Sequence, residues 1–287
     1  MKRLGQHFLK NKSKIKKIIE VLAPKENETI IEIGAGHGEL TDKLVIKNPK
    51  LKIIAIEKDI KLSEKLQKKF KTHQNIEIIN DDVLKILPNL IKNKNPKNSS
   101  QIQIKNYKIL GNIPYYLTGR FLKIISELEL KPKLIVLTVQ KEVAERICAK
   151  PPKMNLLAAA VQFWAKPEIV EYISKKDFQP MPKVNSAIIR LKPLKTSLPQ
   201  FFKEKYYQLI KIVFKQPRKT ILNNLKNGLK LEKTEIIRKL SLIKVKPEKR
   251  PQDLNLKTLY NLTYIINQKN KHYNYLYGIL IFYIFLY

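Results

Sequence analysis

Short apolar runs alternate with amphipathic stretches from residue 28 to residue 190, and this alternation limits the possible folds more than any other feature. The runs predict seven strands: Thr29–Ile33, Lys52–Ile56, Ile76–Asn80, Tyr107–Leu110, Leu134–Val139, Ile169–Ile173 and Ala187–Leu191. Between the early strands, Leu40–Ile46 and Ile60–Phe70 have helical spacing. Strands that alternate with helices build a mostly parallel, doubly wound α/β sheet.

The end of this region departs from the parallel pattern. Residues 174–186 form a polar, proline-containing connection without room for a helix, so the last two strands are predicted to be antiparallel. Residues 192–199 contain two prolines and are typical of a linker. Helical spacing then recurs in four segments, which predict a small all-helical domain: Phe201–Phe214, Thr220–Leu229, Thr234–Leu240 and Leu254–Asn267.

We therefore divide the chain into a domain of residues 1–193, a helical domain of residues 200–270 and an apolar tail of residues 271–287. The apolar run at the end of the tail, Tyr275–Tyr287, is shorter than the roughly 20 residues that a transmembrane helix needs. We expect packing or disorder for it, and no membrane partner. The basic N-terminus lacks the apolar core of a signal peptide, so a cytoplasmic location is expected.

The charge of the chain is strongly unbalanced. Lys and Arg number 57 against 24 Asp and Glu, which gives a formal net charge of +33. A field of this sign attracts nucleic acid or another polyanion, although a chain rich in Lys, Ile and Asn also fits a composition bias across a whole genome. Cys148 is the only cysteine, so a disulfide framework and a cysteine zinc cluster are excluded, and no metal site is expected.

A glycine turn follows the first predicted strand. Ile30–Ile33 runs directly into Gly34-Ala35-Gly36-His37-Gly38, where glycines allow the backbone to approach a ligand closely. The third glycine comes one position too early for the G-x-G-x-x-G pattern, which argues against a nicotinamide dinucleotide. A tight strand-to-helix turn without a ligand is the simpler alternative.

Carboxylates end the next two strands. Glu57 can accept hydrogen bonds from both hydroxyls of a ribose, and Asp82 can accept from the amino group of an adenine while Val83 packs against its ring. Solvated strand-end carboxylates are the alternative, and Asp81 competes with Asp82. Together with Asn112 beyond the fourth strand, the arrangement best matches S-adenosylmethionine.

Gly111-Asn112-Ile113-Pro114-Tyr115 follows the fourth strand, at the edge where open α/β sheets hold their ligands. An amide, a proline-stiffened backbone and an aromatic ring are placed within one turn. This combination suits a planar base that carries an exocyclic amine.

Six separate motifs make the chain resemble the rRNA adenine N6,N6-dimethyltransferase family of the KsgA type over nearly all of residues 3–265. They are residues 5–9 (GQHFL), 32–38 (EIGAGHG), 111–115 (GNIPY), 140–143 (QKEV), 178–186 (FQPMPKVNS) and 214–220 (FKQPRKT). The resemblance implies a Rossmann-like class I methyltransferase sheet with a C-terminal helical domain. It also implies S-adenosyl-L-methionine as cofactor and two adjacent adenines in the 3′-terminal loop of small-subunit rRNA as substrate.

The same resemblance assigns roles to residues. The Asn112 side-chain oxygen and the Ile113 carbonyl accept hydrogen bonds from the adenine N6 amine, and Pro114 stiffens the turn. Tyr115 stacks on the base, and Phe178 covers its other face. The cofactor-binding residues are His7, Leu9, Gly34, Gly36, Glu57, Asp82, Val83 and Asn112.

An RNA partner, in the form of the immature small ribosomal subunit, follows from the family and agrees with the charge. Lys183, Arg218 and Lys219 are the candidate RNA-binding residues, and a monomer is expected. The chain departs from the family pattern at Tyr116, where Asn is frequent, and at Gln216-Pro217, which replaces a more basic pair.

Three other functions compete with this hypothesis. They are a resistance methyltransferase of large-subunit rRNA, a non-catalytic RNA-binding assembly factor and a nicotinamide dehydrogenase. Residues 5–9 and Arg218-Lys219-Thr220 favour the small-subunit enzyme over the first. The intact turn of residues 111–115 argues against the second, and the glycine spacing argues against the third.

Overall fold

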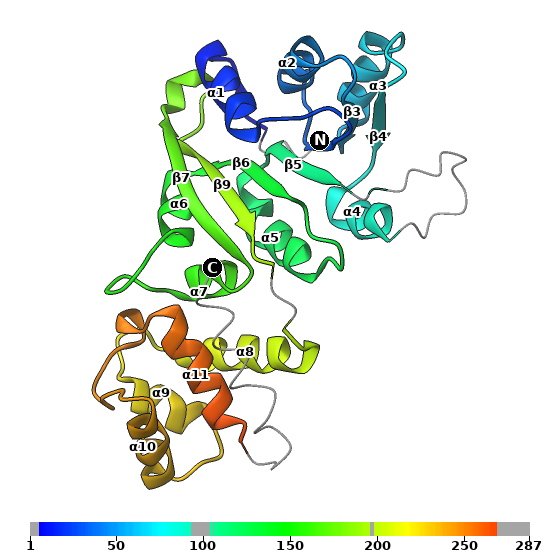
Figure 1. Cartoon of the computed structure of the whole chain (residues 1–287). Helices are drawn as coiled ribbons and strands as arrows, with labels where there is room; N and C mark the ends of the chain where they lie inside the picture. Colours follow the sequence, from blue (N-terminus) through cyan, green and yellow to red (C-terminus); the bar gives the residue numbers. More distant parts are fainter. Residues whose placement is uncertain (1–5, 93–103, 105, 196–197, 269–287) are drawn as a thin grey trace. The chain divides into compact units, whose positions relative to one another are not determined.

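The computed structural model describes residues 6–92, 104, 106–195 and 198–268. The chain divides into two compact units, and each is described here by itself (Figure 1). The first comprises the described residues up to 145 together with residues 165–193. The second comprises residues 146–164 together with the described residues from 194 onward. The apolar tail, residues 271–287, lies outside the described residues.

A seven-stranded sheet forms the centre of the first unit, with the order β4-β3-β2-β5-β6-β9-β7. Its strands are β2 (Thr29–Ile33), β3 (Lys52–Glu57), β4 (Ile76–Asn80), β5 (Tyr107–Asn112), β6 (Leu134–Gln140), β7 (Ala165–Ile173) and β9 (Ser186–Pro193). β2 to β6 pair in parallel, whereas β9 lies between β6 and β7 and is antiparallel to both. The predicted mixed sheet with an antiparallel final pair is confirmed.

The strand order reverses beside β2. From β2 the chain steps outward to β3 and β4, and it then returns to place β5 on the other side of β2. The carboxyl ends of β2 and β5 are therefore a topological switch point, where open α/β sheets leave a crevice for a ligand. Gly111 pairs with Ile33 across this point. A Cβ on Gly111 would lie 3.0 Å from the Ile33 carbonyl oxygen, so a larger residue here would push the two strands apart by a few tenths of an ångström.

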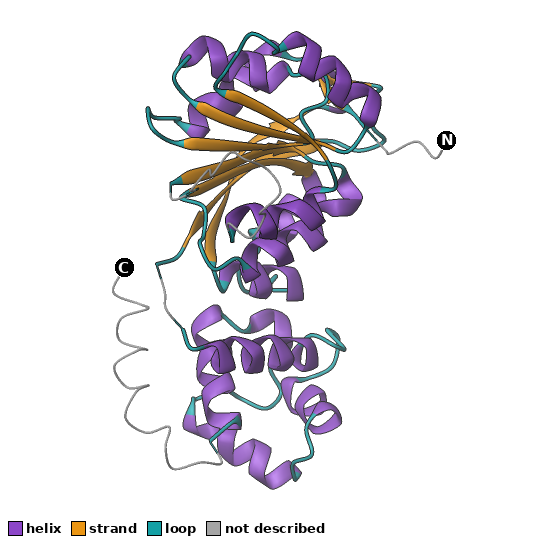
Figure 2. Ribbon diagram, turned by 90° about the vertical axis from the view of Figure 1, so that its right-hand side faces the viewer, coloured by secondary structure: helices purple, strands orange, loops and turns teal. Residues whose placement is uncertain are grey.

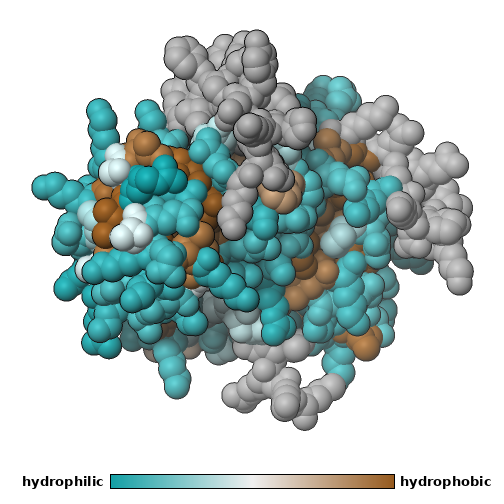
Figure 3. All heavy atoms as spheres, turned by 90° about the horizontal axis from the view of Figure 1, so that it is seen from below, coloured by the Kyte–Doolittle hydropathy of each residue, from teal (hydrophilic) through white to brown (hydrophobic). Residues whose placement is uncertain are grey.

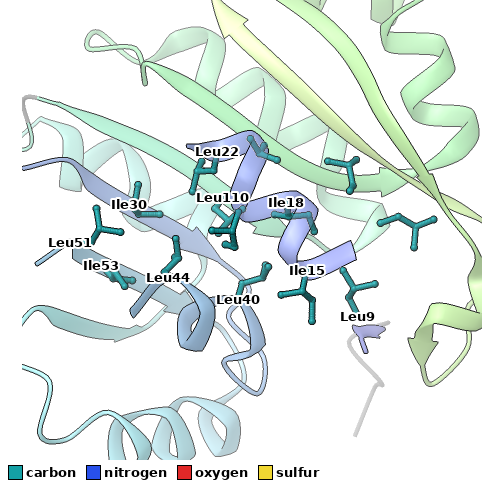
Figure 4. Packing of buried hydrophobic residues seen from close by; sticks show 14 of the residues in the cluster. Leu9, Ile15, Ile18, Leu22, Ile30, Leu40, Leu44, Leu51, Ile53 and Leu110 are labelled. Carbon is teal, nitrogen blue, oxygen red and sulfur yellow. The ribbon is translucent and has the colours of Figure 1, made fainter. Parts of the chain in front are cut away.

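Helices cover both faces of the sheet (Figure 2). They are α1 (Lys12–Leu22), α2 (Glu39–Lys47), α3 (Ile60–Lys69), α4 (Val83–Ile91), α5 (Thr118–Glu127) and α6 (Lys141–Ile147). On one face, α1 and α2 bury a continuous apolar cluster against β2, β3 and β5 (Figure 4). The members that point toward one another in this view include Ile15, Ile18, Leu22, Leu40, Leu44, Ile30, Ile53 and Leu110.

A small sheet connects the N-terminal motif to a distant loop. β1 (Phe8–Leu9) pairs antiparallel with β8 (Phe178–Gln179), with Phe8 opposite Gln179 and Leu9 opposite Phe178. Sequence analysis predicts neither strand, because two residues are too few to show a period. The pairing places the segment before α1 beside the segment before β9.

The second unit is all helical. It contains α7 (Leu156–Gln162), α8 (Gln200–Val213), α9 (Ile221–Gly228), α10 (Lys233–Leu242) and α11 (Leu256–Ile266). Phe163 stacks on Tyr206 at 4.1 Å and on Tyr260 at 5.3 Å between ring centroids. These contacts join residues 146–164 to the helices after residue 199, whereas the sequence-based division placed those residues in the first domain. Such long-range packing leaves no local pattern in the sequence.

The described part of one face of the molecule is mainly polar. Hydrophilic side chains dominate the described part of the face in Figure 3, and the hydrophobic ones occur in smaller patches. No described helix is long and apolar enough to cross a bilayer.

Candidate active site

A cavity lies at the carboxyl ends of β2, β3, β4 and β5, on the switch point of the sheet. It brings together ten of the predicted catalytic and cofactor-binding residues. They are His7, Gly34, Gly36, Glu57, Asp82, Val83, Asn112, Ile113, Pro114 and Tyr115. Leu9 and Phe178, the remaining two, do not line it.

The glycine turn has the backbone that its sequence requires. Gly34 has a φ of +67° and Gly36 a φ of +60°, which L side chains rarely adopt. A Cβ on Gly36 would also lie 3.0 Å from the Phe8 ring, which packs over the turn and against the His37 ring at 4.3 Å between centroids. The N-terminal motif therefore packs directly on the turn. A glycine at position 36 leaves room for the Phe8 ring, which a Cβ would approach too closely.

Glu57 is buried at the end of β3, and its carboxylate is fixed by backbone groups. One oxygen accepts from the Gly36 N–H at 2.9 Å, and the other accepts from the Asp59 N–H at 2.9 Å. A carboxylate can accept about four hydrogen bonds, so both oxygens keep capacity for further donors. This matches a side chain that holds two hydroxyls, although the ribose role of Glu57 stays a prediction.

Asp82 begins helix α4. One carboxylate oxygen caps the helix by accepting from the Leu84 N–H at 2.9 Å, and the other accepts from the Lys58 ammonium at 2.8 Å. Partial burial opposes the charged form, but these two donors outweigh it and hold the pKa of Asp82 below its usual value. Val83 is buried beside it. Sequence analysis did not identify Lys58, which lines the same cavity.

Asn112 closes the opposite side of the cavity. Its side-chain nitrogen donates to the His7 carbonyl oxygen at 2.8 Å, which fixes the orientation of the amide. Among the described residues its side-chain oxygen has no hydrogen-bond partner, so that oxygen is available as an acceptor in the cavity. The sequence pattern predicted the acceptor but could not predict the contact that orients it, because His7 lies 105 positions away.

Pro114 and Tyr115 form the next part of the turn. Pro114 has a φ of −54°, and its carbonyl accepts from the Leu117 N–H at 2.9 Å in the 3₁₀ helix η1 (Tyr115–Leu117). The Tyr115 hydroxyl makes a 2.7 Å hydrogen bond with Ser186 of β9, and its ring stacks on His7 at 5.8 Å between centroids. Burial raises the pKa of Tyr115, so the phenol stays neutral at physiological pH. The ring is thus held at both ends before any base arrives.

Leu9 and Phe178 lie elsewhere in the structure. Each is 4% exposed, and both belong to the apolar cluster beneath α1. They face each other across the β1–β8 pair. Phe178 therefore packs in the core here, and its role as second wall of the base pocket stays a prediction.

The predicted RNA-binding residues are all exposed. Lys183 lies on the connection between β8 and β9 in the first unit. Arg218 and Lys219 lie between α8 and α9 in the second unit. No group of three or more His, Cys, Asp or Glu side chains able to hold a metal ion occurs among the residues that the structure describes.

The sheet order, the glycine turn and the carboxylates at successive strand ends define a class I methyltransferase dependent on S-adenosylmethionine. A family model described as ribosomal RNA adenine dimethylase matches residues 1–268, and the chain belongs to that family. The predicted family, enzyme class and cofactor are confirmed.

Individual relatives agree with this assignment. The chain is 37% identical over 274 residues to ribosomal RNA small subunit methyltransferase A of Mycoplasma capricolum, covering 93% of this chain and 98% of the relative. A dimethyladenosine transferase structure from Plasmodium falciparum is 27% identical, with a TM-score of 0.71 over 89% of this chain and 96% of that one. The structure of the 23S rRNA methyltransferase ErmE shares the fold at 22% identity, with a TM-score of 0.70 over 91% of this chain and 100% of that one.

Proposed function

We propose that this enzyme transfers methyl groups from S-adenosylmethionine to N6 of two adjacent adenines in the 3′-terminal loop of small-subunit rRNA. The observation that carries the proposal is the oriented Asn112 amide, whose acceptor oxygen shares a cavity with Glu57 and Asp82. The names of the Mycoplasma and other curated relatives support the small subunit as the substrate. We also propose that the enzyme acts as a monomer, in the cytoplasm, on an immature small ribosomal subunit.

The residues of the cavity fit the cofactor. Gly34 and Gly36 take positive φ and line the cavity without side chains, Glu57 offers acceptor capacity to a ribose, and Asp82 with Val83 receives an adenine ring. When bound, the cofactor supplies a methyl group on a positively charged sulfur, which is a strong electrophile. Asp82 is already ionised and oriented by the α4 N-terminus, so it accepts from an amino group without rearrangement.

The turn of residues 112–115 prepares the other reactant. The N6 lone pair of adenine is delocalised into the ring, which makes N6 a poor nucleophile. Acceptance of its two N–H bonds by the Asn112 oxygen and the Ile113 carbonyl draws N6 toward tetrahedral geometry and frees the lone pair. Alignment of that lone pair with the methyl group supplies most of the rate enhancement, so a strong general base is not required.

Aromatic stacking completes the substrate site. The Tyr115 ring is fixed by Ser186 and His7, and base stacking on such a ring contributes roughly 1–3 kcal/mol. Because the phenol is neutral, it acts as a surface for the base and not as the proton acceptor. The target adenine must leave its own stack, which costs least in an unpaired loop.

Methyl transfer from labelled cofactor to isolated small subunits and, in parallel, to isolated large subunits tests the proposal, followed by identification of the modified base. We expect N6,N6-dimethyladenine in the small-subunit rRNA. Label confined to large-subunit rRNA would instead support the resistance enzyme, whose main support here is the fold shared with ErmE. Absence of dimethyladenine from both subunits would overturn the proposed activity.

The variant Asn112→Ala tests the mechanism within the same assay. It removes the oriented oxygen, so we expect methyl transfer to fall at least about 100-fold, the scale of losing one oriented hydrogen-bonding group in an active site. The affinity for RNA, measured by filter retention, should stay near the wild-type value because the Asn112 side chain is neutral and does not attract phosphates by charge. Methyl transfer at the wild-type rate would show that the Asn112 amide does not bind the N6 amine of the adenine.

A further inference from the structure

Tyr116 is the most exposed aromatic residue of the cavity lining. Its side chain is 58% exposed, whereas neighbouring Tyr115 is half-buried and hydrogen-bonded. The backbone beneath it is held, because the Leu117 N–H donates to the Pro114 carbonyl and the Thr118 hydroxyl donates to the Tyr115 carbonyl at 3.1 Å. The ring is therefore presented to solvent from a fixed turn at the rim of the cavity.

Tyr116 has no ring contact, ion pair or hydrogen bond with another described residue. Most large exposed apolar side chains in a protein need no explanation. Tyr116 differs because it lines the cavity that we assign to the target base.

The open surface begins three residues further on. Gly119 lies in helix α5 without a positive φ, and a Cβ built on it would meet no atom within 4 Å. Neither the backbone conformation nor packing therefore requires a glycine here, and the surface at this position is open.

Two basic residues lie near Tyr116, one in the sequence and one in the cavity lining. Arg120 is exposed in the first turn of α5, four residues after Tyr116 of η1. Lys58 lines the same cavity and forms a 2.8 Å ion pair with Asp82. An aromatic surface between cations is the arrangement with which proteins hold single-stranded nucleic acid.

We propose that Tyr116 is the platform on which the nucleobase next to the target adenine stacks, with Arg120 facing the phosphate between them. The inference rests on the proposed function and names a second base-binding position of the same site. Tyr115 and Tyr116 are consecutive, with Cα atoms about 3.8 Å apart, as the two bases are consecutive in the RNA. While one adenine of the pair occupies the pocket, the adjacent base lies at the rim that Tyr116 forms.

The test combines protein variants with altered RNA. Small subunits are assembled on rRNA whose ligated 3′ segment carries either the intact loop or an abasic nucleotide beside one target adenine, on its 5′ or its 3′ side. Methylation of the remaining adenine is measured. Tyr116→Ala on intact RNA should raise KM by roughly 5- to 150-fold, the range of one base stack. Tyr116→Phe keeps the ring and should restore KM to within about twofold of the wild type.

Non-additivity is the decisive result. If Tyr116 stacks on the neighbouring base, one of the two abasic substrates should raise the KM of the wild type by about the same factor as Tyr116→Ala does on intact RNA. The KM of Tyr116→Ala should then be the same for that abasic substrate and for intact RNA. The stacking proposal would be overturned if, for both abasic substrates, the effects of the variant and of the abasic site on KM multiply. An unchanged KM for Tyr116→Ala on intact RNA would also overturn it. The midpoint of thermal unfolding should be the same for Tyr116→Ala and wild type, because the side chain is 58% exposed, and this measurement controls for folding. Wild-type enzyme that fails to methylate intact subunits would reject the proposed function, a result distinct from failure of the platform alone.

Discussion

At the scale of single residues, orientation is provided mainly by backbone groups. The His7 carbonyl orients Asn112, and the Gly36 and Asp59 amides fix Glu57. Residue types at strand ends allowed the sequence to predict these side chains as ligands. It could not predict their partners, since a contact such as Tyr115 with Ser186 joins residues 71 positions apart.

Glu32 gives a pH-dependent prediction at this scale. It is 1% exposed in β2, and burial raises its pKa from 4.5 to about 8, against the hydrogen bond from the Thr41 hydroxyl at 2.6 Å. The folded protein therefore keeps a proton that the unfolded chain loses between pH 4.5 and pH 8. As the pH rises through this window, the free energy of unfolding of the wild type should fall by about 1.4 kcal/mol per pH unit relative to that of Glu32→Gln. Above pH 8 the difference between the two proteins should be constant.

Urea denaturation of both proteins from pH 5 to pH 9 measures this difference. Glu26→Gln, the same change at an exposed position, is the control. A constant difference between wild type and Glu32→Gln across the window would mean that Glu32 is ionised in the folded protein.

Ser186→Ala tests whether Tyr115 must be held before the base arrives. The change removes the 2.7 Å hydrogen bond and leaves the half-buried phenol without that partner. A hydrogen bond contributes about 0.5–1.5 kcal/mol, so kcat/KM for methyl transfer should fall by roughly two- to tenfold. Single-turnover kinetics measures the effect, with Ser241→Ala in α10, whose hydroxyl bonds only within its own helix, as the control. Equal rates for the two variants would contradict the role of Ser186.

At the scale of elements, the site depends on strand ends that the sequence predicts and on pairings that it does not. Apolar runs between polar segments located all seven strands of the main sheet. The strands of its centre, such as β2 and β3, are buried on both faces and therefore read as continuous hydrophobic stretches. The β1–β8 pair was missed, although it places Phe8 over the glycine turn. Such short pairings depend on tertiary contacts, and only the motifs at residues 5–9 and 178–186 signalled that these segments matter.

Helix α1, which follows β1, is held by a buried cation. Lys108 of β5 donates to the carbonyl oxygens of Leu22 and Ala23 at the helix end, and it forms a 2.8 Å ion pair with buried Glu28. Lys108→Met leaves a buried carboxylate and two carbonyls without this partner. The free energy of unfolding should fall by about 3–5 kcal/mol, as measured by urea denaturation.

Two further variants make this prediction specific. Lys16→Met removes a solvent-exposed pair with Glu20 on the same helix and should cost at most about 0.5 kcal/mol. The double variant Lys108→Met, Glu28→Gln removes the unpaired charge and should recover part of the loss. A similar small cost for Lys108→Met and Lys16→Met would show that the buried cation does not hold α1.

At the scale of the whole molecule, charge and composition predicted a polyanionic partner without locating the surface that binds it. The net charge of +33 is spread over both compact units, and the three candidate RNA-binding residues are divided between them. Charge count therefore cannot distinguish a binding surface from a general bias toward lysine. The salt dependence of binding can distinguish them, because it reports the number of phosphates that are contacted.

We predict that the triple variant Lys183→Ala, Arg218→Ala, Lys219→Ala binds rRNA with a weaker salt dependence. Each lost phosphate contact lowers the slope of log Kobs against log salt by about 0.7 for single-stranded RNA, so the slope should decrease by about 2. The matched control replaces Lys25, Lys47 and Lys50, three exposed lysines that precede β2 and β3 at the opposite edge of the sheet from the cavity. This control should keep the wild-type slope, because the same charge is removed away from the site. Equal decreases in the two triple variants would mean that the charge attracts RNA without a defined surface, and that the three predicted residues make no phosphate contacts.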